Sequence, residues 1–247
     1  MRRVGTLILA CGAALLLCLP CGAKAQAVNW VAGDLPPFAW HEGDQAEGYA
    51  VDLLRALSER LKRPMSLQFY PWARAVHMTQ NGQGLGVFPL ARTPDREGRF
   101  QWLIPLQRVD YRLFSLSRQA TASPAPGLDA LRRAPVGVLR GSPIRAHLQE
   151  QRFERIVEGK DYQELLRLLR LGVISAIYAG APMLNAAIDK AGLTREQFEV
   201  GLSFGNAELY MACSLNVSEA ELRLWRQAYQ QLLDEGTVER LQQRWLR

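Results

Sequence analysis

The chain of 247 residues carries 30 lysines and arginines against 24 aspartates and glutamates, a formal net charge of +6. Three of the basic residues, Arg2, Arg3 and Lys24, lie in an N-terminal segment that we expect to be removed, which leaves +3. That excess is too small to indicate a nucleic-acid partner, and no basic stripe interleaved with aromatic residues accompanies it.

The first 25 residues have the pattern of an export signal. The stretch 4–22 has no charged residue, and Ala23-Lys24-Ala25 is a typical cleavage site before Gln26. A membrane anchor is the alternative, but Pro20 and three glycines interrupt the apolar stretch. We therefore predict a signal peptide over 1–25, cleaved near Ala25, and a periplasmic protein of about 222 residues, enough for one large domain or two of roughly 100 residues.

Cysteine usage agrees with export. Of the four cysteines, three lie in the predicted signal, and only Cys213 remains in the mature chain. A single cysteine excludes an internal disulfide and a cysteine metal site. Because Cys213 ends an apolar run, we expect a buried and unreactive thiol.

Short apolar runs alternate with segments of helical period along the chain. In chain order, the pattern predicts a strand over 28–31, a helix over 49–62, a strand over 65–70, a helix over 72–80 and a strand over 85–90. It then predicts a strand over 136–139, a helix from 143, a helix from 161 to Gly172, a strand over 174–178 and a helix over 182–191. Asp161…Glu164 and Ser218…Glu221 have the spacing of capping boxes, and two helices complete the chain to residue 245. Such alternation predicts mostly parallel sheets covered on both faces.

Two long strand-rich stretches, 100–117 and 198–214, interrupt this alternation. They are typical of a chain that crosses from one lobe to another and later returns. We therefore expect an α/β protein with a first lobe over 26–110, a second lobe over 111–205, and a return to the first lobe over 206–247.

Enzyme motifs are weak. Gly201-Leu202-Ser203-Phe204-Gly205 matches the G-x-S-x-G of serine hydrolases, but a strand follows it and no histidine comes after His147. The histidines His41, His77 and His147 lie far apart, without metal-ligand spacing. We expect no catalytic residue, no metal and no cofactor.

Two features suggest anion binding. Arg96 lies in the charged run 91–100, and a guanidinium can hold a carboxylate through two parallel hydrogen bonds. Ser142 lies between a strand and Pro143, where we expect it to cap a helix whose free N–H groups face a ligand. Taken singly, each pattern is more often a surface arginine or an ordinary cap.

The order of several segments is more specific. The segments 33–38, 48–54, 70–75, 88–96, 137–142 and 234–245 resemble the extracellular solute-binding proteins of family 3, the polar amino-acid receptors of ABC importers. The resemblance implies a two-lobed, periplasmic-binding-protein-like fold of type II, with the ligand cleft between the lobes. It implies that Arg96 holds a ligand carboxylate and that Gly141 and Ser142 add hydrogen bonds. The ligand-binding residues predicted in this way are Asp34, Phe38, Trp40, Tyr70, Trp72, Phe88, Pro89, Leu90, Ala91, Arg96, Arg140, Gly141, Ser142, Tyr178 and Gly180.

The chain departs from the family where an amino acid's ammonium group would bind. Gly180 stands where the family places an aspartate, and Pro89 and Ala91 replace serines. A buried ammonium without a carboxylate costs several kcal/mol. Unless Asp34 takes over, a less polar acid or an aromatic solute would suit this lining better than an α-amino acid.

The sequence thus predicts a monomeric periplasmic protein that captures a small carboxylate-bearing solute, an amino acid or related organic acid, by lobe closure and delivers it to an ABC permease. An enzyme on the same scaffold, resembling the periplasmic cyclohexadienyl and prephenate dehydratases, is an alternative. It would need a general acid, for which Glu47, Asp34 and His41 are the available groups. A ligand-sensing module for a membrane partner is a second alternative.

Overall fold

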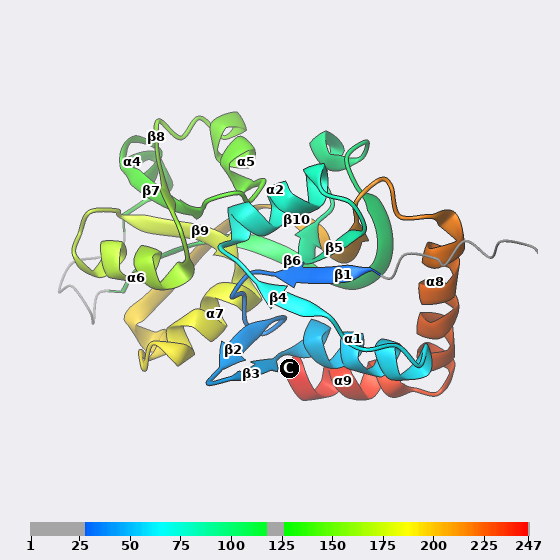
Figure 1. Ribbon diagram of the computed structural model, residues 1–247. Coiled ribbons are helices and arrows are strands. Elements are labelled where there is room, and N and C mark those ends of the chain that lie inside the picture. The colour runs from blue at the N-terminus through cyan, green and yellow to red at the C-terminus, as the bar shows by residue number, and fades with distance from the viewer. Residues whose placement is uncertain (1–27, 118–125, 247) are drawn as a thin grey trace, which may run out of the picture.

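The computed structural model describes residues 28–117 and 126–246, so the predicted signal peptide lies outside the described residues. One eight-stranded sheet runs through the molecule in the order β4-β1-β5-β10-β6-β9-β7-β8 (Figure 1). Its two ends are each made of three parallel strands. Each end belongs to one of two lobes. The parallel strands alternate with helices in both lobes, which confirms the predicted α/β class.

The first lobe is built on β1 (Asn29–Ala32), β4 (Leu67–Phe69) and β5 (Leu85–Ala91). The helices α1 (Tyr49–Arg60) and α2 (Trp72–Asn81) lie on opposite faces of these strands (Figure 1), close to the predicted limits. Trp30 of β1 packs edge-on against Trp225, with ring centroids 5.3 Å apart. Trp225 belongs to α8 (Glu219–Asp234), which packs against α1 together with α9 (Thr237–Trp245). The C-terminal helices therefore complete the core of the first lobe.

The second lobe is built on β7 (Pro135–Leu139), β8 (Arg155–Gly159) and β9 (Ala176–Gly180). Its helices are α4 (Leu128–Arg133), α5 (Ile144–Glu150), α6 (Tyr162–Arg170) and α7 (Ala181–Lys190). The Asp161 side chain accepts the Glu164 N–H at 2.7 Å at the start of α6. Ser218 likewise accepts the Glu221 N–H, at 3.2 Å, at the start of α8. Both predicted N-caps are confirmed, although neither glutamate accepts the N–H of its capping residue as a full capping box requires.

Two strands of sixteen residues, β6 (Gln101–Leu116) and β10 (Phe198–Cys213), join the lobes. They pair antiparallel from Phe198↔Leu116 to Cys213↔Gln101. β5 pairs with the C-terminal end of β10, whereas β9 pairs with the C-terminal end of β6. The predicted lobe limits at 110, 205 and 206 fall within these two strands and stay a prediction.

The long strands also account for two other predictions. Gly201 to Gly205 lies inside β10, so no helix follows Ser203 and the nucleophile elbow is absent there. Cys213, the last residue of β10, is completely buried, and burial raises the pKa of its thiol well above the usual range. Within residues 28–117 and 126–246, no helix has the length and apolar character to cross a bilayer.

Four elements were not predicted: α4, β8, and the two strands of a hairpin, β2 (Trp40–Glu42) and β3 (Gln45–Glu47). All are short, from three to six residues, and have many polar side chains, so no apolar period identifies them. Two single turns of 3-10 helix, η1 (Pro94–Arg96) and η2 (Arg195–Gln197), complete the described elements.

Candidate functional site

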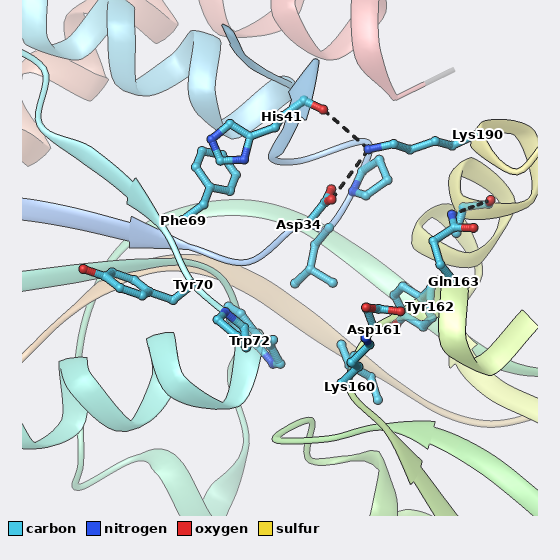
Figure 2. A pocket seen from close by; sticks show the side chains of 15 residues that line it. Asp34, His41, Phe69, Tyr70, Trp72, Lys160, Asp161, Tyr162, Gln163 and Lys190 are labelled. Carbon is cyan, nitrogen blue, oxygen red and sulfur yellow. Dashed lines mark hydrogen bonds and ion pairs between the residues drawn. The ribbon is translucent and has the colours of Figure 1, made fainter. Parts of the chain in front are cut away.

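A cavity of about 470 Å³ lies between the two lobes, at the carboxyl ends of parallel strands (Figure 2). This is the edge of an open α/β sheet at which ligands bind. Asp34 follows β1 and Tyr70 follows β4, while Leu139 ends β7 and Lys160 follows β8. The full lining is Asp34, Leu35, Pro36, His41, Phe69, Tyr70, Pro71, Trp72, Leu139, Lys160, Asp161, Tyr162, Gln163, Ala187 and Lys190.

A smaller cavity of about 30 Å³, roughly the volume of one water molecule in the liquid, lies beside it. Four side chains line both cavities: Leu35 and Trp72 from the first lobe, and Leu139 and Tyr162 from the second. The two spaces are therefore adjacent and share part of their lining. The other residues that line the smaller cavity are Pro89, Ala91, Arg96, Tyr111, Ser142, Pro143, Ile144, Met183 and Leu209.

Arg96 is the charged residue of the smaller cavity. It ends the 3-10 turn η1, which Pro94 begins, and only 7% of its surface is exposed. Its guanidinium donates to the Ala91 carbonyl at 3.1 Å and to the Gly141 carbonyl, in the second lobe, at 2.8 Å. Arg96 therefore connects the strand β5 of its own lobe to the turn after β7.

The charge of Arg96 lacks a counter-ion in the described part of the chain. None of the ion pairs between described residues includes it. Burial lowers the pKa of the guanidinium, although the charge of Asp95 acts in the opposite direction. Burial also raises the pKa of the nearby Tyr111 phenol above its ordinary value, so Tyr111 remains neutral at physiological pH. A buried cation that forms no ion pair is stabilised by an anion that reaches it.

The turn after β7 approaches the first lobe closely at Gly141. Its φ is 80°, and a Cβ added there would lie 2.7 Å from the Cα of Ala73. A side chain at this position would therefore push the lobes apart. Only glycine allows both the positive φ and this approach.

The predicted helix cap at Ser142 is wrong. The helix α5 begins at Ile144, after Pro143, and spans only seven residues. The Ser142 hydroxyl donates to the Leu139 carbonyl at 2.6 Å instead of accepting a helix N–H. The positive φ of Gly141 turns the chain back toward β7, so Ser142 closes that turn rather than starting the helix.

The rest of the smaller cavity is apolar. Within the part of the chain that the structure describes, none of its lining residues is acidic. Gly180, at the end of β9, is buried, and a Cβ added there would lie 2.6 Å from Cε of Met183. Met183 thus occupies the space that a side chain at position 180 would need.

Charged residues gather at the larger cavity. Lys190, the last residue of α7, lies 3.6 Å from a carboxylate oxygen of Asp34 and donates to the His41 carbonyl at 3.5 Å (Figure 2). Both partners belong to the first lobe, so Lys190 links the lobes across the cavity. The His41 ring packs on Phe69, with centroids 4.0 Å apart.

Lys190→Ala is expected to weaken ligand binding by a few fold, because an exposed ion pair contributes only about 0.2–1 kcal/mol. The effect should shrink as salt rises, since ions screen exposed charges. Titration calorimetry at two salt concentrations measures it. Lys160→Ala, at the same cavity but without a described ion pair, is the matched control. A salt-independent loss in both variants would contradict a link between Lys190 and Asp34.

The predicted ligand-binding residues fall into three groups. Those that line a cavity are Asp34, Tyr70, Trp72, Pro89, Ala91, Arg96 and Ser142. Those adjacent to the smaller cavity are Gly141, through its carbonyl on Arg96, and Gly180, through Met183. Those placed elsewhere are Phe38, Phe88, Leu90 and Tyr178, which are completely buried in the core, Trp40, which packs on Trp245, and Arg140, which is exposed near Glu158.

Several lining residues were not predicted. Leu35, Tyr111, Leu139, Tyr162 and Met183 come from five different segments, and in the sequence each is an ordinary core residue. Only Tyr162 carries a local signal, since it follows the helix cap Asp161 and so lies at the cleft end of α6. Of the candidate general acids, Asp34 and His41 line the larger cavity, whereas Glu47 lies in β3, outside both linings.

The model of the bacterial extracellular solute-binding proteins, family 3, matches residues 29–247. This chain belongs to that family. No curated protein matches the sequence. The match covers both lobes and the C-terminal helices.

Solved structures with the same fold include binding proteins and a sensor. An ancestral arginine-binding protein bound to arginine is 16% identical, with a TM-score of 0.74 over 90% of this chain and 99% of the other. A histidine kinase sensor domain is 20% identical, with a TM-score of 0.78 over 90% and 97%. A substrate-binding protein of an amino-acid ABC transporter from Streptococcus pneumoniae, bound to L-arginine, is 17% identical, with a TM-score of 0.74 over 88% and 94%. At these identities the likeness shows the fold alone.

Proposed function

We propose that this family 3 member is a periplasmic binding protein that captures a small carboxylate-bearing solute between its lobes and presents it to an ABC permease. The observation that carries the proposal is Arg96, a buried guanidinium without a counter-ion among the described residues, at a cavity between two lobes. A carboxylate there would accept charge-assisted hydrogen bonds, which are about twice as strong as neutral ones.

Contacts between the lobes support binding by closure. Arg96 reaches the Gly141 carbonyl, and Lys190 reaches Asp34 and the His41 carbonyl. These contacts link the two lobes, and closure over a bound carboxylate would exclude water from it and strengthen its pairing with Arg96.

The proposal is tested by a thermal-shift screen of the mature chain against amino acids and small organic acids, followed by calorimetry of each hit. We expect at least one carboxylate to raise the melting temperature, because a ligand that binds only the folded state stabilises it. We also expect one ligand per chain and a monomer in solution. The absence of any carboxylate ligand, or consumption of the added acid, would overturn the proposal.

A further inference from the structure

We propose that the solute is an elongated carboxylate without an α-ammonium group, whose uncharged ring-bearing end fills the larger cavity. This inference rests on the proposed function, because it assumes that Arg96 holds the carboxylate. It differs from the amino-acid ligands of the structural neighbours, and three observations on the described residues support it.

The first observation is the lack of an ammonium acceptor beside Arg96. None of the described residues that line the smaller cavity is acidic, and Met183 fills the space next to Gly180. The acidic lining residues belong to the larger cavity, and both have partners: Asp34 pairs with Lys190, and Asp161 accepts the N–H of Glu164. An α-ammonium, which lies next to its own carboxylate, would be buried against apolar side chains at a cost of several kcal/mol.

The second observation is the difference in size between the two spaces. The smaller cavity, at about 30 Å³, leaves room for little more than a carboxylate group. The larger one, at about 470 Å³, lies within the range of pockets that enclose whole drug-sized ligands. Because Leu35, Trp72, Leu139 and Tyr162 line both, a ligand anchored on Arg96 would pass between these side chains into the larger space.

The third observation is the character of the larger cavity. Its walls are mostly rings and aliphatic groups, with Trp72 from the first lobe and Tyr162 from the second at different sides of the space (Figure 2). Asp34 and Asp161 are balanced by Lys160 and Lys190, so the lining favours neither sign of charge on the ligand. Aromatic walls without net charge suit a planar, uncharged group.

The test compares matched ligands by calorimetry. Indole-3-propanoate has the carboxylate and the ring, L-tryptophan adds the α-ammonium, and propanoate lacks the ring. We expect indole-3-propanoate to bind at least about tenfold more tightly than either, since burial of a ring contributes about tenfold or more in affinity. Tighter binding of L-tryptophan, or equal binding of propanoate, would overturn the inference.

These outcomes separate the inference from the proposed function. If L-tryptophan or a short acid binds best and its binding depends on Arg96, the proposed function stands and the inference fails. If no carboxylate binds, or binding does not depend on Arg96, the proposed function itself fails. The comparison of the three ligands uses the wild-type chain, and only the dependence on Arg96 requires the Arg96→Met variant, whose folding is checked by its melting transition.

Two variants test directly whether the lack of an acidic acceptor for an α-ammonium group sets the ligand preference. Gly180→Asp combined with Met183→Ala supplies a carboxylate and the space that it needs. We expect the double variant to shift its preference toward L-tryptophan by at least about tenfold. Met183→Ala alone, which changes only the volume, should keep the preference for indole-3-propanoate. A folded double variant, verified by its melting transition, that kept the wild-type preference would overturn the inference.

Discussion

Arg96→Met is expected to weaken binding of the carboxylate ligand by at least about 30-fold. Removing one partner of a buried, hydrogen-bonded charge pair costs roughly 2–5 kcal/mol of binding free energy, which is about 30-fold or more in Kd. Methionine keeps much of the side-chain volume, so the loss would come from the charge and its hydrogen bonds. Calorimetry with the best ligand of the screen measures it.

Arg92→Met is the matched control for this variant. Arg92 lies four residues away, is exposed and pairs with Glu97 at 2.7 Å. We expect its replacement to leave Kd unchanged. The melting temperature of ligand-free Arg96→Met should stay close to that of the wild type, because removal of a desolvated cation without a described counter-ion is offset by the loss of its hydrogen bonds to the Ala91 and Gly141 carbonyls. Full affinity of Arg96→Met would contradict the role of Arg96.

The second large effect is on stability. Arg63→Ala is expected to lower the free energy of unfolding by about 3–5 kcal/mol. Arg63 forms an ion pair with Glu221, whose side chain has 0% exposure, and Glu221 also accepts the indole N–H of Trp225 at 2.9 Å. Without Arg63 the Glu221 carboxylate would be left buried and without an ion-pair partner. The cost falls on Glu221 because its side chain is fully buried, whereas 27% of the Arg63 side chain is exposed to water. Urea denaturation measures the difference.

A double variant distinguishes the cost of the unpaired Glu221 carboxylate from the loss of the other contacts of Arg63. Arg63→Ala with Glu221→Gln should recover much of the stability, because a neutral amide is less costly to bury and can still accept from Trp225. Arg226→Ala, which breaks the exposed pair with Glu219 on the same helix, should have a far smaller effect. Equal losses in Arg63→Ala and the double variant would contradict this explanation.

Much of the secondary structure could be predicted because its signals are local. The apolar period over 49–62 gives α1, and the Asp161 and Ser218 side chains cap α6 and α8 as their spacing predicts. Ser142 failed as a cap because the positive φ of Gly141 redirects the chain, so that the Ser142 hydroxyl donates to the Leu139 carbonyl. Phe38, Trp40 and Tyr178 were predicted as ligand contacts, but rings bury equally well in a core, and the sequence does not say on which side of a strand a cavity lies.

The sequence alone determined the alternation of strands and helices, the two long crossing strands and the family, because each depends on residue types at fixed spacing. The tertiary structure decided which residues share a space with Arg96. Leu35, Tyr111, Tyr162 and Met183 are far apart in the chain and meet only because β6 and β10 join the two lobes within one sheet. It also decided that Arg96 is buried without a described counter-ion, since desolvation depends on everything packed around a charge rather than on its neighbours in sequence.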